Sequence, residues 1–168
     1  MNDRKRKDEE PFLNLIDRNI GILIKISNFY AHTKRDREDL INDIVFELWK
    51  SFDKFKGGSS ISTWIYRVAL NTSMNYARKY KRDSIFSLGM QDRDFKGDSW
   101  IIEQRDESLQ AIMYKSIEEL NGLDKALVLL YLDSKSYEEI AQITGISKTN
   151  VGTKLSRIKE YLKNICNT

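Results

Sequence analysis

Hydrophobic positions in the first third of the chain recur at intervals of three and four residues. Over about 12–31, after a charged leader at 1–10, this spacing predicts an amphipathic helix. A second helix with the same periodicity is predicted to follow a polar turn and to end near Ser51. Asp36 is expected to be its N-cap, with Asp39 three residues later in a capping-box-like arrangement.

Lys56, followed by two glycines and two serines at 57–60, interrupts this pattern before a third helical segment. That helix is predicted to run from 61 to about 80 and to be capped by Ser60 or Ser62. Residues 83–106 have no sustained periodicity, so we expect a linker there that is largely extended.

The second half contains two further helical segments, at 109–120 and 123–132, and then the pattern of a helix-turn-helix. Ala141 is small where two helices would cross, Gly145 can adopt positive φ at the turn, and Ser147 can cap the following helix. The predicted inward anchors of that helix are Val151, Leu155, Ile158 and Leu162. Its predicted outward face comprises Lys148, Thr149, Asn150, Gly152, Thr153, Lys154, Ser156 and Arg157. A plain helical hairpin is the alternative reading, and the basic outer face favours DNA binding.

These elements predict an all-α protein of two small helical domains joined by a flexible acidic linker, with the helix-turn-helix in the second. The expected boundaries are 1–82 for the first domain, 83–106 for the linker and 107–168 for the second domain. One proline and eight glycines in 168 residues agree with long helices and disfavour sheet-rich folds.

Composition excludes several classes of function. The single cysteine, Cys166, and the single histidine, His32, rule out an internal disulfide, a zinc ribbon and a catalytic triad that needs a second histidine. Much of classical enzymology is excluded with them. We expect a protein that is not an enzyme, with no catalytic residue, no metal and no cofactor. No run of about 18 apolar residues is present, which predicts no membrane insertion and a cytoplasmic protein.

The net charge of +3 conceals large opposing blocks. Residues 57–82 hold five cations and no acid, and 147–168 hold five cations and one acid. Between them, 83–119 hold four cations and nine acids. Two basic segments separated by an acidic one suggest two contacts with a polyanion, although solvated helix faces can produce the same pattern by chance.

Three tracts taken together resemble the extracytoplasmic-function group of bacterial RNA polymerase sigma factors, part of the sigma-70 superfamily. The tract 36–49 is similar to the helix that docks on the clamp coiled coil of the polymerase β′ subunit. The tract 62–71 is similar to the helix that, with the preceding loop, handles the promoter −10 element. The tract 132–157, which includes the helix-turn-helix, is similar to the domain that reads the −35 element.

The resemblance implies a transcription initiation factor with named contact residues. Those implied for core polymerase are Asp39, Asn42, Asp43, Phe46 and Glu47. Those implied for the −10 element are Lys56, Ser59, Ser60, Arg67, Asn71, Asn75, Arg78 and Lys79. Those implied for the −35 element are Lys148, Thr149, Asn150, Thr153, Lys154 and Arg157. The implied partners are core RNA polymerase, promoter DNA and an anti-sigma factor.

Two aromatic residues in the third helix have more than one interpretation. Trp64 can pack in the core, which its place in an amphipathic helix favours, or stack on an unpaired base. For Tyr66 both interpretations stay open.

Two other functions are compatible with parts of the sequence. A stand-alone helix-turn-helix regulator would use the first half for dimerisation or sensing and would bind duplex DNA unaided. A helical hydrolase or nuclease would hold a metal with Asp36, Asp39 and Asp43, but no further acidic cluster or histidine supports that function.

Overall fold

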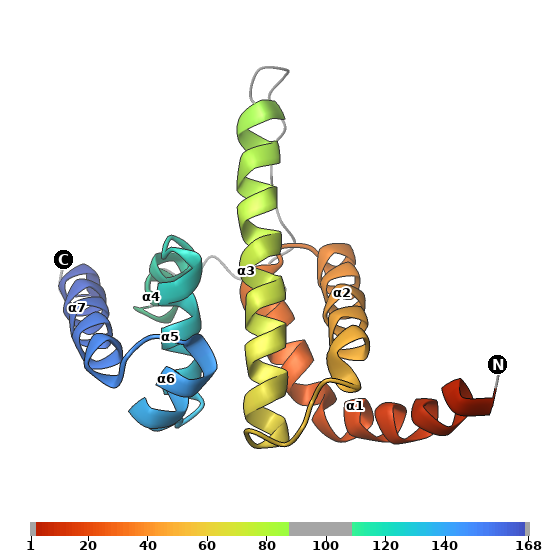
Figure 1. Ribbon diagram of the computed structural model, residues 1–168. Coiled ribbons are helices and arrows are strands. Elements are labelled where there is room, and N and C mark those ends of the chain that lie inside the picture. Colours follow the sequence, from red (N-terminus) through yellow and green to blue (C-terminus); the bar gives the residue numbers. More distant parts are fainter. Residues whose placement is uncertain (1–2, 88–108, 167–168) are drawn as a thin grey trace. The chain divides into compact units, whose positions relative to one another are not determined.

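A computed structural model describes residues 3–87 and 109–166, and every regular element in these ranges is an α-helix (Figure 1). The helices are α1 (Asp3–Tyr30), α2 (Lys34–Phe52), α3 (Ile61–Ser87), α4 (Leu109–Glu118), α5 (Gly122–Leu132), α6 (Tyr137–Thr144) and α7 (Lys148–Cys166). The predicted all-α fold is therefore confirmed. None of the helices in the described ranges is both long enough and apolar enough to cross a membrane.

The chain divides into two compact units, 1–76 and 77–168, and the division falls inside α3. The first unit contains α1, α2 and most of α3, and the second contains α4 to α7. Residues 88–106 of the expected linker lie outside the described residues, whereas 83–87 form the end of α3, where a largely extended chain was expected. The expected domain boundaries stay predictions.

The first helix begins much earlier than expected from its hydrophobic spacing. α1 starts at Asp3, not near residue 12, and contains Pro11. All residues from 3 to 10 are charged, so they provide no apolar stripe to detect. Arg, Lys and Glu are nevertheless good helix formers, and their propensity extends the helix beyond its amphipathic part.

The N-cap of α2 is Thr33, so the prediction of Asp36 was wrong. The Thr33 side chain accepts the Asp36 backbone N–H at 3.1 Å, and Thr33 has the extended backbone of an N-cap. Asp36 lies in the first helical turn, where its negative charge suits the positive end of the helix.

The third helix also extends beyond its predicted end near Tyr80 and reaches Ser87. The first helix-breaking residue after Tyr80 is Gly89, so no local signal stops the helix earlier. At its start, Ser60 Oγ accepts the Thr63 N–H at 3.1 Å, which confirms Ser60 as the cap.

The core of the first unit forms where the apolar stripes of its helices meet. Side chains from all three helices are almost fully excluded from solvent: Leu23, Ile26, Leu40, Ile44, Leu48, Ile65, Ala69 and Leu70. Phe12 adds edge-to-face contacts to Trp49 and Phe52, with ring centroids 4.9 and 5.3 Å apart. This aromatic group holds α1 against the end of α2.

The second unit is built on α5, which is buried from Lys125 to Leu130 as its apolar sequence predicts. Its N-cap is Asn121, whose side chain accepts the Asp124 N–H at 3.0 Å. α4, α6 and α7 complete the unit, and their buried side chains are Ile117, Ile140, Ile143, Val151, Leu155 and Ile158.

Candidate nucleic-acid and protein interfaces

The helix-turn-helix has the local geometry predicted from its sequence. Ser136 caps α6 in a capping box: its Oγ accepts the Glu139 N–H at 3.2 Å, and its own N–H donates to Glu139 Oε2 at 2.8 Å. Gly145 ends α6 with φ +77°, and its N–H donates to the Ala141 carbonyl at 2.8 Å. The chain can turn sharply there because glycine has no Cβ to oppose positive φ.

The second helix of the motif, α7, is capped as expected, and three of its four predicted anchors are buried; the fourth, Leu162, is only half-buried. Ser147 Oγ accepts the Asn150 N–H at 3.2 Å. Val151, Leu155 and Ile158 are buried, which turns the other side of the helix outward. Gly152 was expected on the outward side but is half-buried, and a Cβ added to it would lie 3.5 Å from Cε2 of the Tyr137 ring.

The outward side of α7 exposes Lys148, Thr149, Asn150, Thr153, Ser156 and Arg157. Two of the predicted DNA contacts have partners inside the unit. Lys148 Nζ donates to Glu138 Oε1, and this hydrogen bond lowers the pKa of Glu138. Lys154 is half-buried, and its Nζ lies 3.0 Å from Asp124 Oδ1.

The face of α2 opposite the core brings together the residues expected to bind polymerase. Asp39, Asn42, Asp43 and Phe46 are exposed, and Glu47 is half-exposed. Phe46 is 60% exposed although it is large and apolar. Lys50 lies over the Phe46 ring and also donates to Glu47 Oε1 at 2.9 Å, so the charge of Glu47 is partly compensated.

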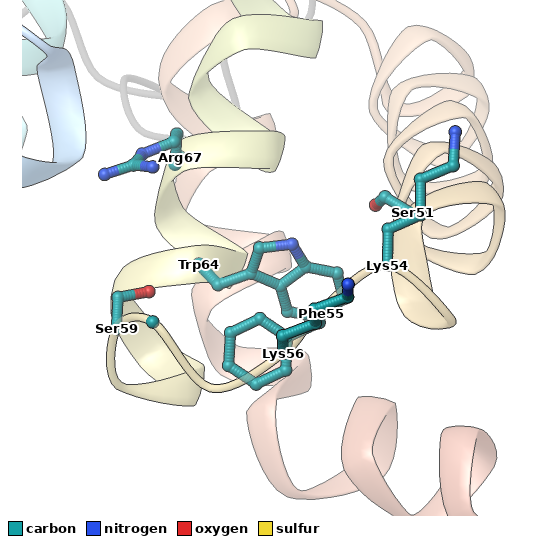
Figure 2. A pocket seen from close by; sticks show the side chains of 8 residues that line it. Ser51, Lys54, Phe55, Lys56, Ser59, Trp64 and Arg67 are labelled. Carbon is teal, nitrogen blue, oxygen red and sulfur yellow. The ribbon is translucent and has the colours of Figure 1, made fainter.

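A shallow pocket of about 390 Å³ lies where the loop 53–60 meets α3 (Figure 2). It is lined by Ser51, Lys54, Phe55, Lys56, Gly58, Ser59, Trp64 and Arg67. Figure 2 shows the rings of Phe55 and Trp64 next to one another, with Arg67 on one side and Ser51 and Lys54 on the other. Gly57, with φ +75°, lets the loop turn back towards α3.

The two aromatic residues that had open interpretations differ in their surroundings. Tyr66 is buried, so the structure favours packing for it. Trp64 is half-buried and packs against Phe55, with ring centroids 4.9 Å apart and an interplanar angle of 30°. Its remaining surface lines the pocket, which makes packing and stacking compatible for Trp64.

Of the eight residues expected at the −10 element, three line the pocket: Lys56, Ser59 and Arg67. Asn71 and Asn75 are exposed on α3 at successive four-residue steps from Arg67, and Arg78 and Lys79 are exposed further along that helix. The hydroxyl of Ser60 already has partners within the protein: it accepts the Thr63 N–H as the helix cap and donates to Thr63 Oγ1 at 2.8 Å.

Sequence reasoning did not name two residues of this pocket, Lys54 and Phe55. Both immediately precede the glycine and serine loop, and an aromatic residue flanked by lysines is a local signal for nucleic-acid contact. Their relation to Trp64 depends on the fold of the loop, which local sequence patterns do not reveal.

The proposed metal ligands of a hydrolase do not assemble. Among the residues whose side chains the structure describes, no three His, Cys, Asp or Glu are grouped to hold a metal ion. Asp36, Asp39 and Asp43 therefore provide no metal centre for that alternative.

Two family models match the chain in the expected order. Sigma-70 region 2 matches residues 15–83, and Sigma-70 region 4 matches residues 110–162. The first covers α2, the pocket and most of α3, and the second covers α5, α6 and most of α7.

Relatives and solved structures agree with these matches. The ECF RNA polymerase sigma-E factor of Escherichia coli (strain K12) is 29% identical over 139 residues, which cover 77% of this chain and 73% of that protein. The protein of the same name from Haemophilus influenzae is 27% identical and covers 94% and 88%.

Two solved structures are similar in fold. The sigma factor RpoE of Bartonella quintana, in complex with the anti-sigma factor NepR, has a TM-score of 0.68 at 20% identity, covering 97% of this chain and 98% of that chain. CnrH, in complex with the cytosolic domain of CnrY, has a TM-score of 0.67 at 17% identity, covering 95% and 89%. With regions 2 and 4 matched in order and relatives over most of its length, this chain belongs to the extracytoplasmic-function sigma factors of the sigma-70 superfamily.

Proposed function

We propose that this sigma factor of transcription initiation divides its work among three surfaces. The exposed face of α2 docks on the clamp coiled coil of the β′ subunit of core RNA polymerase. The pocket beside α3 and the cations of that helix bind the −10 element, and α7 reads the −35 element. One observation carries the assignment: a basic helix-turn-helix and a separate basic, aromatic pocket occur in one chain that matches both sigma regions.

The α2 face has the features of a protein-binding surface. Phe46 supplies an apolar anchor that is already largely exposed, and Asp39 and Asp43 supply charge on the same side. An aromatic anchor surrounded by polar groups is the usual composition of an interface whose binding energy is concentrated in a few residues. The acidic groups select a partner with a basic surface and speed its approach.

The pocket suits an unpaired nucleobase better than a base pair. Aromatic side chains can stack on any base, and Lys54, Lys56 and Arg67 place positive charge around them. A protein that binds the separated strand more tightly than the duplex shifts the equilibrium towards the open form without breaking a covalent bond. This is how a protein without catalytic residues can promote promoter opening.

The helix α7 suits major-groove recognition. The N-terminal residues of a recognition helix face base edges, and here they are Lys148, Thr149 and Asn150. Arg157 is exposed two turns further on and is positioned to meet a phosphate. The proposed division of labour assigns 1–82 to polymerase and the −10 element, 83–106 to a linker and 107–168 to the −35 element.

An anti-sigma factor is a further proposed partner, since the similar structure of RpoE from Bartonella quintana contains a sigma factor bound to the anti-sigma factor NepR. We place the action of the protein in the cytoplasm, where its core polymerase works.

Run-off transcription with purified core polymerase and genomic fragments tests the proposed function. Transcripts from discrete start sites are expected only when this chain is added. A chain that binds duplex fragments tightly alone and does not change transcription by core polymerase would instead be a stand-alone regulator.

The docking face is tested by Asp43→Arg, which places a cation where a basic coiled coil is expected to bind. We predict loss of co-purification with core polymerase and an unchanged melting temperature, because Asp43 is exposed. The matched control is Asp17→Arg, the same change at an exposed acid of α1 outside the face. Equal co-purification of both variants with core polymerase would remove α2 from the docking surface.

A further inference from the structure

The helix α7 carries two lysines that are paired with acids in very different surroundings. Lys148 and Glu138 have side chains that are 61% and 59% exposed. Lys154 and Asp124 are only 38% and 18% exposed. An ion pair that is open to water contributes little and exchanges partners easily, whereas one that is partly buried is screened less.

The acid that holds Lys154 is itself held in place. Asp124 lies in the first turn of α5, and Asn121 Nδ2 donates to its Oδ2 at 2.6 Å. The backbone N–H of Asp124 donates to Asn121 Oδ1 at 3.0 Å. One carboxylate oxygen is therefore fixed by the helix cap, and the other, Oδ1, accepts Lys154 Nζ at 3.0 Å.

Moving Lys154 to a DNA phosphate would have a cost that moving Lys148 would not. Asp124 would lose its cation while mostly shielded from water, and a partly buried charge without a partner is destabilising. Glu138 would lose its partner in open solvent, where water replaces it.

Resting on the proposed role of α7 in DNA recognition, we propose that Lys154 is not a phosphate contact but part of a brace. Asn121, Asp124 and Lys154 tie the recognition helix α7 to α5, and Asp124 is a positioning residue for promoter recognition. Lys148 exchanges Glu138 for an acceptor on a base edge when DNA binds. The brace sets the orientation of the N-terminal turn of α7, whose side chains face the bases.

The salt dependence of DNA binding separates a brace from a phosphate contact. Each phosphate contact adds about one unit to the slope of log K against log salt concentration, whereas a brace within the protein adds none. The protein would be measured as holoenzyme on a promoter fragment that gives a run-off product. Arg157→Ala is the reference for a lost phosphate contact and is expected to lower the slope by about one unit.

Lys154→Met is expected to weaken binding about threefold to tenfold at every salt concentration, with no change in slope. Lys154→Arg should restore affinity by re-forming the pair with Asp124. Asp124→Asn should weaken binding to a similar degree, and the double variant Asp124→Asn with Lys154→Met should be no weaker than either single variant. A melting curve of each variant confirms folding before the comparison.

Two results would overturn the brace. In the first, Lys154→Met lowers the slope by about one unit, as Arg157→Ala does. In the second, Asp124→Asn strengthens binding and steepens the slope, which would mean that Asp124 only withholds Lys154 from DNA. If Arg157→Ala also leaves slope and affinity unchanged, α7 is not the DNA-binding face, and the proposed function of this helix fails together with the brace.

Discussion

The turn of the helix-turn-helix provides a test of a single physical effect at Gly145. Its φ of +77° lies in the left-handed region, and a Cβ built on it would meet no atom within 4 Å. Gly145→Ala therefore creates no clash with a neighbour, and any loss of stability comes from the backbone conformation.

The expected loss follows from two opposing terms. An L-residue with a Cβ in the left-handed region costs about 1–2 kcal/mol relative to glycine. Alanine restricts the unfolded chain and returns about 0.4–1 kcal/mol. The net destabilisation is about 1 kcal/mol, which for a unit of this size lowers the melting temperature by about 4–8 °C.

Thermal unfolding of the full chain, followed by circular dichroism, measures this shift. Gly145→Asn is expected to lose less, because asparagine visits the left-handed region more readily. Gly21→Ala is a control for which the change in stability should have the opposite sign. Gly21 lies inside α1, and a Cβ added to it also meets no atom within 4 Å. Alanine should therefore stabilise this helix by about 0.5–1 kcal/mol. If Gly145→Ala melts at the wild-type temperature, or Gly145→Asn melts below Gly145→Ala, the turn does not depend on left-handed backbone.

Three further predictions concern a buried hydroxyl without a hydrogen-bond partner among the described residues, a carboxylate in a helix cap and a buried lysine. Ser73 Oγ is buried without a hydrogen-bond partner in the described part of the chain, so Ser73→Ala should raise stability by about 1 kcal/mol; a lower melting temperature would show that the hydroxyl has a partner. The hydrogen bond from the Ser136 backbone N–H lowers the pKa of Glu139. Its carboxylate therefore stabilises the fold above about pH 4.5 and loses this effect as pH falls through the folded pKa. The difference in melting temperature between wild type and Glu139→Gln should shrink in acid, and a difference that grows there would contradict this. Burial lowers the pKa of Lys125, so the unfolded chain binds more protons between the folded pKa and 10.5, and stability rises with pH there. Lys125→Met should melt at a higher temperature at neutral pH, and an advantage that grows as pH approaches 10.5 would contradict this reasoning.

The helix-turn-helix could be predicted from sequence because its determinants are local. Gly145 acts through its own backbone, and Ser147 caps the helix that follows it directly. Each of these interactions is nearly independent of the rest of the fold. The same local rules could not choose between Thr33 and Asp36 as the cap of α2, because both have the right chemistry and lie one turn apart.

Hydrophobic periodicity did not predict a helical segment that has no apolar face, and it did not predict contacts between segments that are separate in the sequence. The charged start of α1 is helical through propensity alone, which a search for stripes does not detect. The pocket required Phe55 and Trp64 to pack across the turn at 56–60, and the pattern of each helix says nothing about that contact. Tertiary packing decided both the half-buried position of Trp64 and the burial of Tyr66.

Counting charges along the sequence overstates how much of the positive charge of α7 is free of interactions within the protein. Residues 147–168 contain five cations, but Lys154 is held in a partly buried pair with Asp124 of α5, whereas the pair of Lys148 with Glu138 of α6 is open to water. A third, Lys159, lies with its Nζ 3.9 Å from the centre of the Tyr131 ring, and hydrogen bonding to that tyrosine raises the pKa of this lysine. Acids that lie distant in sequence cannot be matched to these cations by spacing, since the Lys154 partner is 30 residues away. The positive charge that the outward side of α7 exposes to solvent is therefore set by packing within the unit as well as by the sequence.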